Sequence, residues 1–148
     1  MKLNKYFKIA VVSSMLLLAG CFGLWDSGSD QITGKYIVLW IDLPANQTIS
    51  EQFEVGSSGS SQVVGDYVFA VGHNDDFIIA KQHPSNGFEG GFKVDTKITN
   101  YFIVDMNQKV IKKGNNVWGP LSRKEFDEIR EELRIEDIEF DQLYPEQP

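Results

Sequence analysis

The stretch DYVFAVGHNDDFIIAKQHP, which covers Asp66–Pro84, decides the fold that we expect for this chain of 148 residues. Two apolar runs, Tyr67–Val71 and Asp76–Gln82, flank a short polar segment, Gly72–Asp75. β-Branched and aromatic residues favour strands, and Asn and Asp favour tight turns because their side chains hydrogen-bond the nearby backbone. The pattern therefore predicts a β-hairpin.

Similar apolar runs on both sides of this hairpin predict further strands. Upstream, Lys35–Leu43 is predicted to be a strand stopped by Pro44, and Thr48–Val55 a second strand hydrogen-bonded to it. Downstream, Tyr101–Asp105 and Lys109–Lys112 predict a second hairpin. The intervening GSSGSSQ, residues 56–62, has no side chain that builds a core, and we expect it to be a mobile loop.

The sequence LSRKEFDEIREELRI, residues 121–135, predicts one helix. Gly119–Pro120 breaks the extended segment before it, and Ser122 with Glu125 three residues later forms a capping box. One apolar face, expected to lie on the sheet, follows at helical spacing: Phe126, Ile129 and Leu133. Beyond the helix, apolar and acidic residues alternate up to Leu143, which fits either a short edge strand or coil.

Together these elements predict an α+β fold. We expect a small antiparallel sheet of about five to six strands, built from two hairpins and the N-terminal strands, with one C-terminal helix packed on it. The expected domain covers residues 34–144, a common size for a single core. Residues 145–148 should form a disordered tail.

Residues 1–20 are typical of a signal peptide. Lys2, Lys5 and Lys8 form a basic region, and Ile9–Leu18 forms an apolar region that ends in small residues. A membrane-spanning helix needs about 20 apolar residues, whereas this run is shorter and is interrupted by two serines. We therefore expect an exported protein rather than one that spans the membrane.

The end of this leader, Leu18-Ala19-Gly20-Cys21, resembles the lipobox of bacterial lipoproteins at all four positions. The resemblance implies that a signal peptidase cuts between Gly20 and Cys21 and that the Cys21 sulfur receives a diacylglyceryl group. Two acyl chains anchor a protein stably in a membrane, whereas one chain gives only marginal binding. The expected location is therefore the cell membrane or the outer membrane, with the protein held by lipid.

Residues 21–33 are predicted to be a flexible tether between this lipid and the folded domain, because small polar residues predominate from Asp26 to Asp30. The apolar residues Phe22, Leu24 and Trp25 either sit at the bilayer interface or pack back on the domain.

Charge limits the classes of partner. The leader contains three of the 14 basic residues and none of the 21 acidic ones, so the processed chain has a net charge of −10. Such a surface repels nucleic acid and anionic lipid headgroups, which excludes a nucleic-acid-binding function. The same charge favours a soluble, monomeric domain.

No complete catalytic or cofactor motif is present in the sequence, and two classes of function stay open. The first is a non-enzymatic binding module that holds a protein partner at the envelope. Its candidate binding residues are Phe88 and Phe92, in the glycine-rich segment SNGFEGGFK. Exposed aromatic side chains on loops commonly anchor partners.

The alternative is an envelope hydrolase or metal-dependent enzyme. It would use His73 and His83, which flank one predicted strand, together with nearby carboxylates such as Asp75 or Asp76. Structural zinc needs four ligands and catalytic zinc needs three, so the two histidines alone make no metal site. The enzyme class therefore requires that the fold bring carboxylates and a histidine into one pocket.

The segments YVFAVGHNDDFIIAKQHP, NYFIVD and GPLSRKEFDEIREELRI, in this order, resemble a family of small bacterial lipoproteins catalogued as a domain of unknown function. The resemblance covers roughly residues 35–135. It implies a sheet-plus-helix scaffold. It transfers no functional residue, because the family has no assigned active residues.

The lipobox interpretation predicts that Cys21→Ala leaves the precursor uncut, because the peptidase acts only after the sulfur carries lipid. Metabolic labelling with a fatty acid, combined with the electrophoretic size of the protein, measures both steps. A lipid-labelled protein of mature size from the variant would contradict the interpretation.

Overall fold

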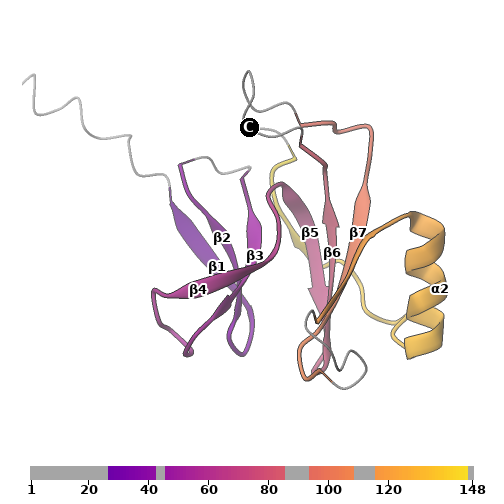
Figure 1. Ribbon diagram of the computed structural model, residues 1–148, viewed down its shortest axis with the longest axis horizontal. Coiled ribbons are helices and arrows are strands. Elements are labelled where there is room, and N and C mark those ends of the chain that lie inside the picture. Colours follow the sequence, from indigo (N-terminus) through magenta and orange to yellow (C-terminus); the bar gives the residue numbers. More distant parts are fainter. Residues whose placement is uncertain (1–26, 43–45, 86–93, 109–115, 147–148) are drawn as a thin grey trace, which may run out of the picture.

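The computed structural model describes residues 27–42, 46–85, 94–108 and 116–146. These residues form two antiparallel sheets and one helix arranged in three layers (Figure 1). The four-stranded sheet is the first layer, the five-stranded sheet is the middle layer, and the helix covers the outer side of the middle layer.

The four-stranded sheet contains the N-terminal half of the described chain in simple antiparallel order. Its strands are β1 (Gly28–Thr33), β2 (Tyr36–Trp40), β3 (Thr48–Gln52) and β4 (Ser60–Val64).

The five-stranded sheet has the order β8-β7-β6-β5-β9. Its strands are β5 (Val68–His73), β6 (Phe77–Gln82), β7 (Asn100–Asp105), β8 (Val117–Leu121) and β9 (Gln142–Leu143). The helix, α2 (Arg123–Leu133), follows β8 directly. Because β5 is connected to β4, the chain passes from one sheet to the other in the three residues 65–67.

Strand β6 is buried on both of its faces. Ile78 and Ala80 lie in the core between the two sheets, whereas Phe77 and Ile79 lie in the core between the five-stranded sheet and α2. Successive side chains of a strand point to opposite faces, so this continuous apolar run needs cover on both sides. The four-stranded sheet covers one side and α2 covers the other.

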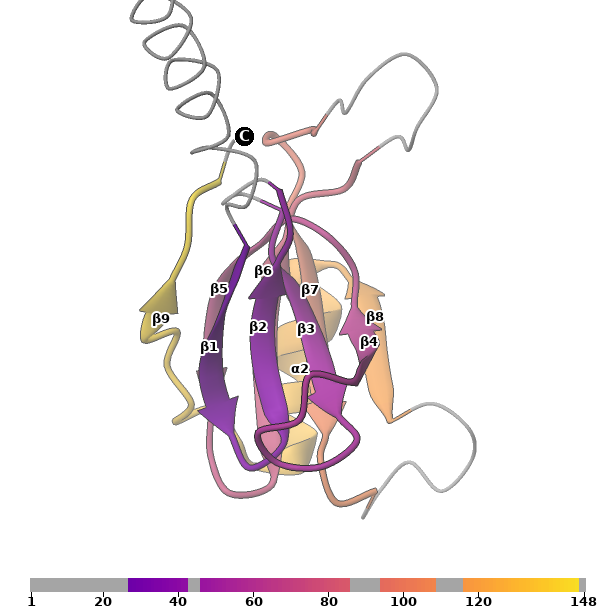
Figure 2. The same ribbon diagram turned by 90° about the vertical axis from the view of Figure 1, so that its left-hand side faces the viewer.

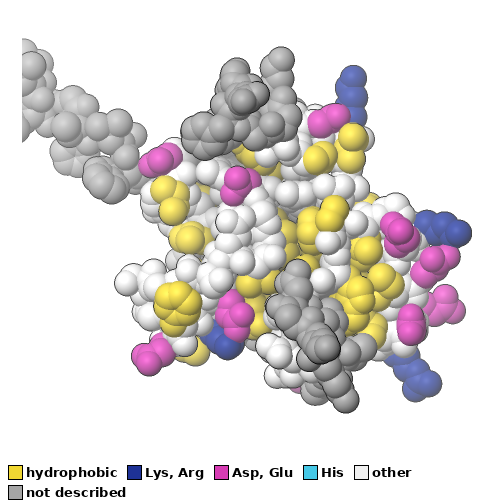
Figure 3. Space-filling model, in the orientation of Figure 1, with side chains coloured by type: hydrophobic (Ala, Val, Ile, Leu, Met, Phe, Trp, Pro, Cys, Tyr) yellow, Lys and Arg dark blue, Asp and Glu magenta, His cyan; other side chains and the backbone are white. Residues whose placement is uncertain are grey.

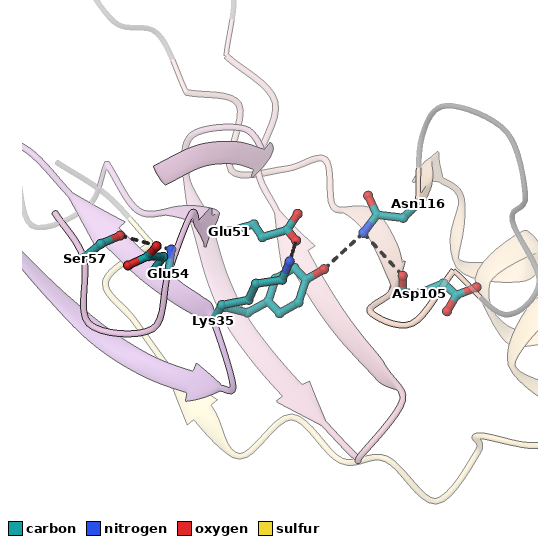
Figure 4. Close-up of polar contacts among 7 residues, drawn as sticks. Lys35, Glu51, Glu54, Ser57, Asp105 and Asn116 are labelled. Atoms are coloured by element: carbon teal, nitrogen blue, oxygen red, sulfur yellow. Dashed lines mark hydrogen bonds and ion pairs between the residues drawn. The ribbon is translucent and has the colours of Figure 1, made fainter. Parts of the chain in front are cut away.

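A polar bridge joins the two sheets at the first residue of β2 (Figure 4). Asn116, just before β8, donates from Nδ2 to the Tyr36 hydroxyl at 3.2 Å and to the Asp105 carbonyl at 3.3 Å. On the other side of Tyr36, Lys35 forms an ion pair with Glu51 at 2.5 Å. The bridge leaves the Tyr36 hydroxyl hydrogen-bonded although the residue is buried.

The predicted α+β class is confirmed, with antiparallel strands and one C-terminal helix. Strands β5 and β6 form the predicted hairpin, whose turn is held by Asn74 Oδ1, which accepts from the backbone N–H groups of Asp76 at 2.9 Å and Phe77 at 2.8 Å. The capping box is also confirmed, since Ser122 Oγ accepts from Glu125 N at 3.3 Å and Glu125 Oε2 accepts from Ser122 N at 2.8 Å.

The number of sheets differs from the prediction of one sheet with five to six strands. The described residues form nine strands in two sheets. The difference arises because two segments of polar sequence are strands. One lies in the expected tether and the other in the expected mobile loop.

Residues 28–33, predicted to belong to the flexible tether, form the edge strand β1. Ile32 is buried in the inter-sheet core, and the indole of Trp40 packs over Gly28, where any side chain would collide with the ring. Gln31 adds hydrogen bonds from Nε2 to the carbonyls of Gly34 at 3.0 Å and Tyr36 at 2.9 Å. One apolar residue and one glycine therefore order this segment.

The segment 56–62, predicted to be mobile, contains a hydrogen-bonded turn and the first residues of β4. Similarly, Gly119–Pro120 does not break the chain before the helix but lies within β8. Strand β8 is at the edge of its sheet, where a proline is tolerated, and the Phe102 ring occupies the space that a side chain at Gly119 would need. The predicted partner of β7, Lys109–Lys112, lies outside the described residues, and β8 pairs with β7.

The segment after the helix forms a short edge strand, which was one of the two structures that the sequence allowed; the other was coil. Gln142 and Leu143 pair with β5, and Tyr144 N donates to the Phe69 carbonyl at 2.9 Å. Of the expected disordered tail, Pro145 and Glu146 are described, and Glu146 lies 3.5 Å from His83.

The helix–sheet core generates a stability prediction. Phe126 is fully buried, with its ring centroid 4.8 Å from that of Tyr101, so Phe126→Ala should lower the free energy of unfolding by about 3–5 kcal/mol. Ser122→Ala removes one capping hydrogen bond at the surface and should lower it by only about 1 kcal/mol. Urea denaturation followed by circular dichroism measures both values. Equally small effects would show that α2 is not packed as described.

Candidate functional site

A hollow in the surface lies on the outer face of the four-stranded sheet. It has a volume of about 530 Å³. Figure 2 looks onto this face, which α2 leaves uncovered because it lies behind the other sheet. We call the hollow the sheet groove.

Strand register explains which side chains line the sheet groove. Val38, Ile49 and Val64 point inward to the core. Their neighbours therefore point outward and form cross-strand pairs, in which Leu39 lies opposite Thr48, Ser50 opposite Gln62, and Gln52 opposite Ser60. All of these except Gln52 line the groove, together with residues of the loops at its two ends: Ile41, Asn46, Phe53, Ser58, Gly59 and Asp66.

One end of the groove is formed by the loop between β3 and β4, which carries Phe53. The Phe53 side chain is 73% exposed, yet its ring lies against Gly59, at 2.8 Å from where a β-carbon would be. The backbone N–H of Phe53 also donates to the Gly59 carbonyl at 3.0 Å. A large apolar side chain is thus presented to solvent in a defined place.

The same loop is held by its own polar groups. Gln52 donates from Nε2 to the Ser57 carbonyl at 2.7 Å and accepts at Oε1 from Gly56 N at 3.1 Å. Ser57 donates from Oγ to the Gly59 carbonyl at 2.9 Å and accepts from Glu54 N at 3.3 Å (Figure 4). The loop is therefore organised by its own hydrogen bonds, which lowers the entropy cost of binding a ligand.

The other end of the groove is formed by Asp66 and Asn46. Burial raises the pKa of the Asp66 carboxyl. The next residue, Tyr67, has a φ of 66°, in the left-handed region that residues with side chains rarely adopt, and it is buried. Asn46 Oδ1 is buried and accepts no hydrogen bond from the residues that the structure describes. Strained backbone and incompletely paired polar groups tend to occur at functional sites.

The two candidate histidines do not come together. His73 pairs with Ile78 near the turn of the hairpin, whereas His83 follows the far end of β6. At about 3.3 Å per residue, five residues of strand separate their backbones by roughly 17 Å. Within the described ranges, no group of three His, Cys, Asp or Glu side chains could hold a metal ion.

His83 is a core residue and not an exposed loop histidine. It is 2% exposed, and its ring stacks on Phe69 with centroids 4.2 Å apart. Its Nδ1 lies 2.8 Å from the Ile98 carbonyl, so this nitrogen carries a proton and donates it. The nearest carboxylate partner is Glu146, not the predicted Asp75 or Asp76.

The polar bridge between the sheets has no catalytic character either. Burial, and then the Glu51 carboxylate, raise the pKa of Tyr36 to about 12. The phenol therefore keeps its proton at neutral pH and acts as neither a base nor a nucleophile. Its contacts fit a structural link between the sheets.

Three sets of predicted residues lie outside the described part of the chain: Cys21 and the cleavage site after Gly20, the candidate binding residues Phe88 and Phe92, and the leader. Ser85 and Val94, which flank the aromatic pair, form an isolated antiparallel bridge. In the stretches that are described, no helix has the length and apolar character needed to cross a bilayer.

Sequence reasoning missed Phe53, Asp66 and Asn46 as site residues. A partial signal was present, because Thr48, Ser50 and Gln52 are all polar and lie on one face of the predicted strand. Phe53 follows them directly, shortly before the serine- and glycine-rich loop.

The described residues form a small α+β domain with two sheets and one covering helix. The sheet groove is open on the surface of this domain. The chain belongs to the family described as a protein of unknown function, DUF3997, whose model matches residues 33–144. This confirms the resemblance to a domain of unknown function, and the lipoprotein part of that interpretation stays a prediction. No curated protein and no solved structure matched the chain.

Asp66 gives a pH-dependent prediction. Since burial raises its pKa in the folded state, the ionised carboxylate destabilises the fold above that pKa. Asp66→Asn should therefore unfold at a higher temperature than the wild type at pH 7. The difference should vanish as the pH falls below about 3.9, where the carboxyl is protonated in both the folded and unfolded states.

Thermal unfolding between pH 3 and 8 measures this difference. Asp75→Asn, at an exposed position on the β5–β6 turn, is the matched control for the loss of one carboxylate. An Asp66→Asn variant less stable than the wild type at pH 7 would show that the carboxylate makes net favourable contacts.

Proposed function

We propose that this protein is a lipid-anchored component of the cell envelope that binds a ligand in the sheet groove without converting it. The observation that carries the proposal is the placement of Phe53, which is 73% exposed on a loop already held by its own hydrogen bonds. Exposed aromatic side chains on ordered loops are frequent anchors of binding sites.

The position of the β3–β4 loop relative to the proposed lipid attachment at Cys21 supports this function. Gly28, where β1 starts, is seven positions after Cys21, and this length of chain spans at most about 25 Å. Strand register puts Gly28 and Thr48 at one end of the four-stranded sheet and Gln52 at the other. Phe53 therefore lies at the end away from the attachment point and open to the envelope space.

Binding without conversion is favoured by the composition of the groove. Among its described lining residues, Asp66 is the single carboxylate, and none is a histidine, cysteine, lysine or arginine. Hydrolysis of glycosidic bonds commonly uses two carboxylates, and acyl transfer uses a nucleophile with an adjacent base. The groove has the polar and apolar groups of a binding site but lacks these pairs.

The test uses the full-length lipidated protein, purified in detergent and immobilised, with three fractions of the envelope: purified cell wall, solubilised membrane proteins and lipid vesicles. We expect retention of one fraction, weakened at least about tenfold by Phe53→Ala, since truncating an aromatic anchor can cost more than about 1.4 kcal/mol. The retained material should be chemically unchanged after incubation.

Val55→Ala is the matched control. Val55 is 74% exposed on the same loop but does not line the groove. This variant should retain the fraction as the wild type does. Equal retention by the wild type and Phe53→Ala, or turnover of the retained material, would overturn the proposal.

A further inference from the structure

The lining of the sheet groove is mostly uncharged and able to form hydrogen bonds. Its uncharged polar members are two amides and four hydroxyl groups, Asn46, Gln62, Thr48, Ser50, Ser58 and Ser60, of which Ser50 is buried. Amides and hydroxyls both donate and accept hydrogen bonds. They therefore match a ligand that carries many groups of the same kind.

Charge argues against an anionic ligand. No basic side chain is among the described residues of the groove, and the chain as a whole carries 21 acidic against 14 basic residues. Figure 3 shows the two sheets from the side, and acidic side chains are visible over both the four-stranded sheet and α2. An anionic polymer would find neither a cationic partner in the groove nor a favourable field around it.

The shape argues for an extended ligand with one apolar face. The groove follows β3 from Asn46 to Phe53, and five residues of strand have a length of about 17 Å. Since Gly59 packs against the Phe53 side chain, the ring is held in place and is still 73% exposed. A sugar ring has an apolar face of C–H groups that can stack on such a ring, and an edge of hydroxyls that can meet the polar lining.

We propose that the sheet groove binds a neutral oligosaccharide, with one sugar ring stacked on Phe53 and the following rings hydrogen-bonded along β3 and β4 by Ser60, Gln62 and Thr48. Asp66 accepts hydrogen bonds from sugar hydroxyls at the other end. The inference rests on the proposed binding function and names the class of ligand for the same site.

The test is calorimetric titration of the full-length protein in detergent with three neutral probes at millimolar concentration: the hexamers of N-acetylglucosamine, of β-1,4-linked glucose and of α-1,4-linked glucose. At least one should bind. Phe53→Ala should weaken its binding about tenfold or more, and Gln62→Ala should weaken it by a smaller factor. Val55→Ala, with equal exposure outside the groove, should bind as the wild type does.

An oligogalacturonate hexamer is the anionic comparison, and it should bind at least about tenfold more weakly than the best neutral probe, a difference of 1.4 kcal/mol. Since Phe53 and Gln62 are both exposed, the variants should retain the wild-type unfolding temperature, which is measured in parallel. Chromatography of the probe after incubation should show unchanged length.

The outcomes separate the two proposals. If none of the neutral probes binds while retention of an envelope fraction still depends on Phe53, the ligand class is wrong and the binding function stands. Retention of solubilised membrane proteins that depends on Phe53 would likewise replace the oligosaccharide with a protein ligand. Neutral binding that Phe53→Ala leaves unchanged, or tighter binding of the anionic probe, would overturn the inference.

Discussion

The two-sided burial of β6 is the constraint on which the rest of the structure depends. A strand with apolar side chains on both faces is stable only in the middle of three layers, and a single helix can cover only one of the two faces. The N-terminal strands are therefore required as a second sheet over Ile78 and Ala80. That sheet needs only its inner face for the core, and its outer face is free to carry the groove.

The elements that could be predicted from the sequence are those determined by residues close together in the chain. The turn at Asn74 and the cap at Ser122 depend on side chains that bond a backbone two or three residues away, so local sequence was sufficient. Strand β1 depends instead on distant packing, because Ile32 and Gly28 gain their partners from β2 and the core. Strand β8 likewise depends on the Phe102 ring against Gly119.

The candidate site was less predictable for the same reason. The groove combines side chains from β2, β3, β4 and two loops, and only the register of the sheet puts them on one face. The histidines show the converse, since they are near each other in sequence but separated by the length of a strand. The stacking of His83 on Phe69 and its bond to the Ile98 carbonyl could not be read from neighbouring residues.

The two edge strands of the five-stranded sheet, β8 and β9, are poorly suited to pair with a strand of another molecule. On one side Pro120 lacks an N–H group, so β8 offers an interrupted row of donors, and on the other side β9 has two residues. Open edges are the usual points at which folded β-proteins aggregate. Copies of this domain crowded together should therefore resist strand-by-strand polymerisation through this sheet.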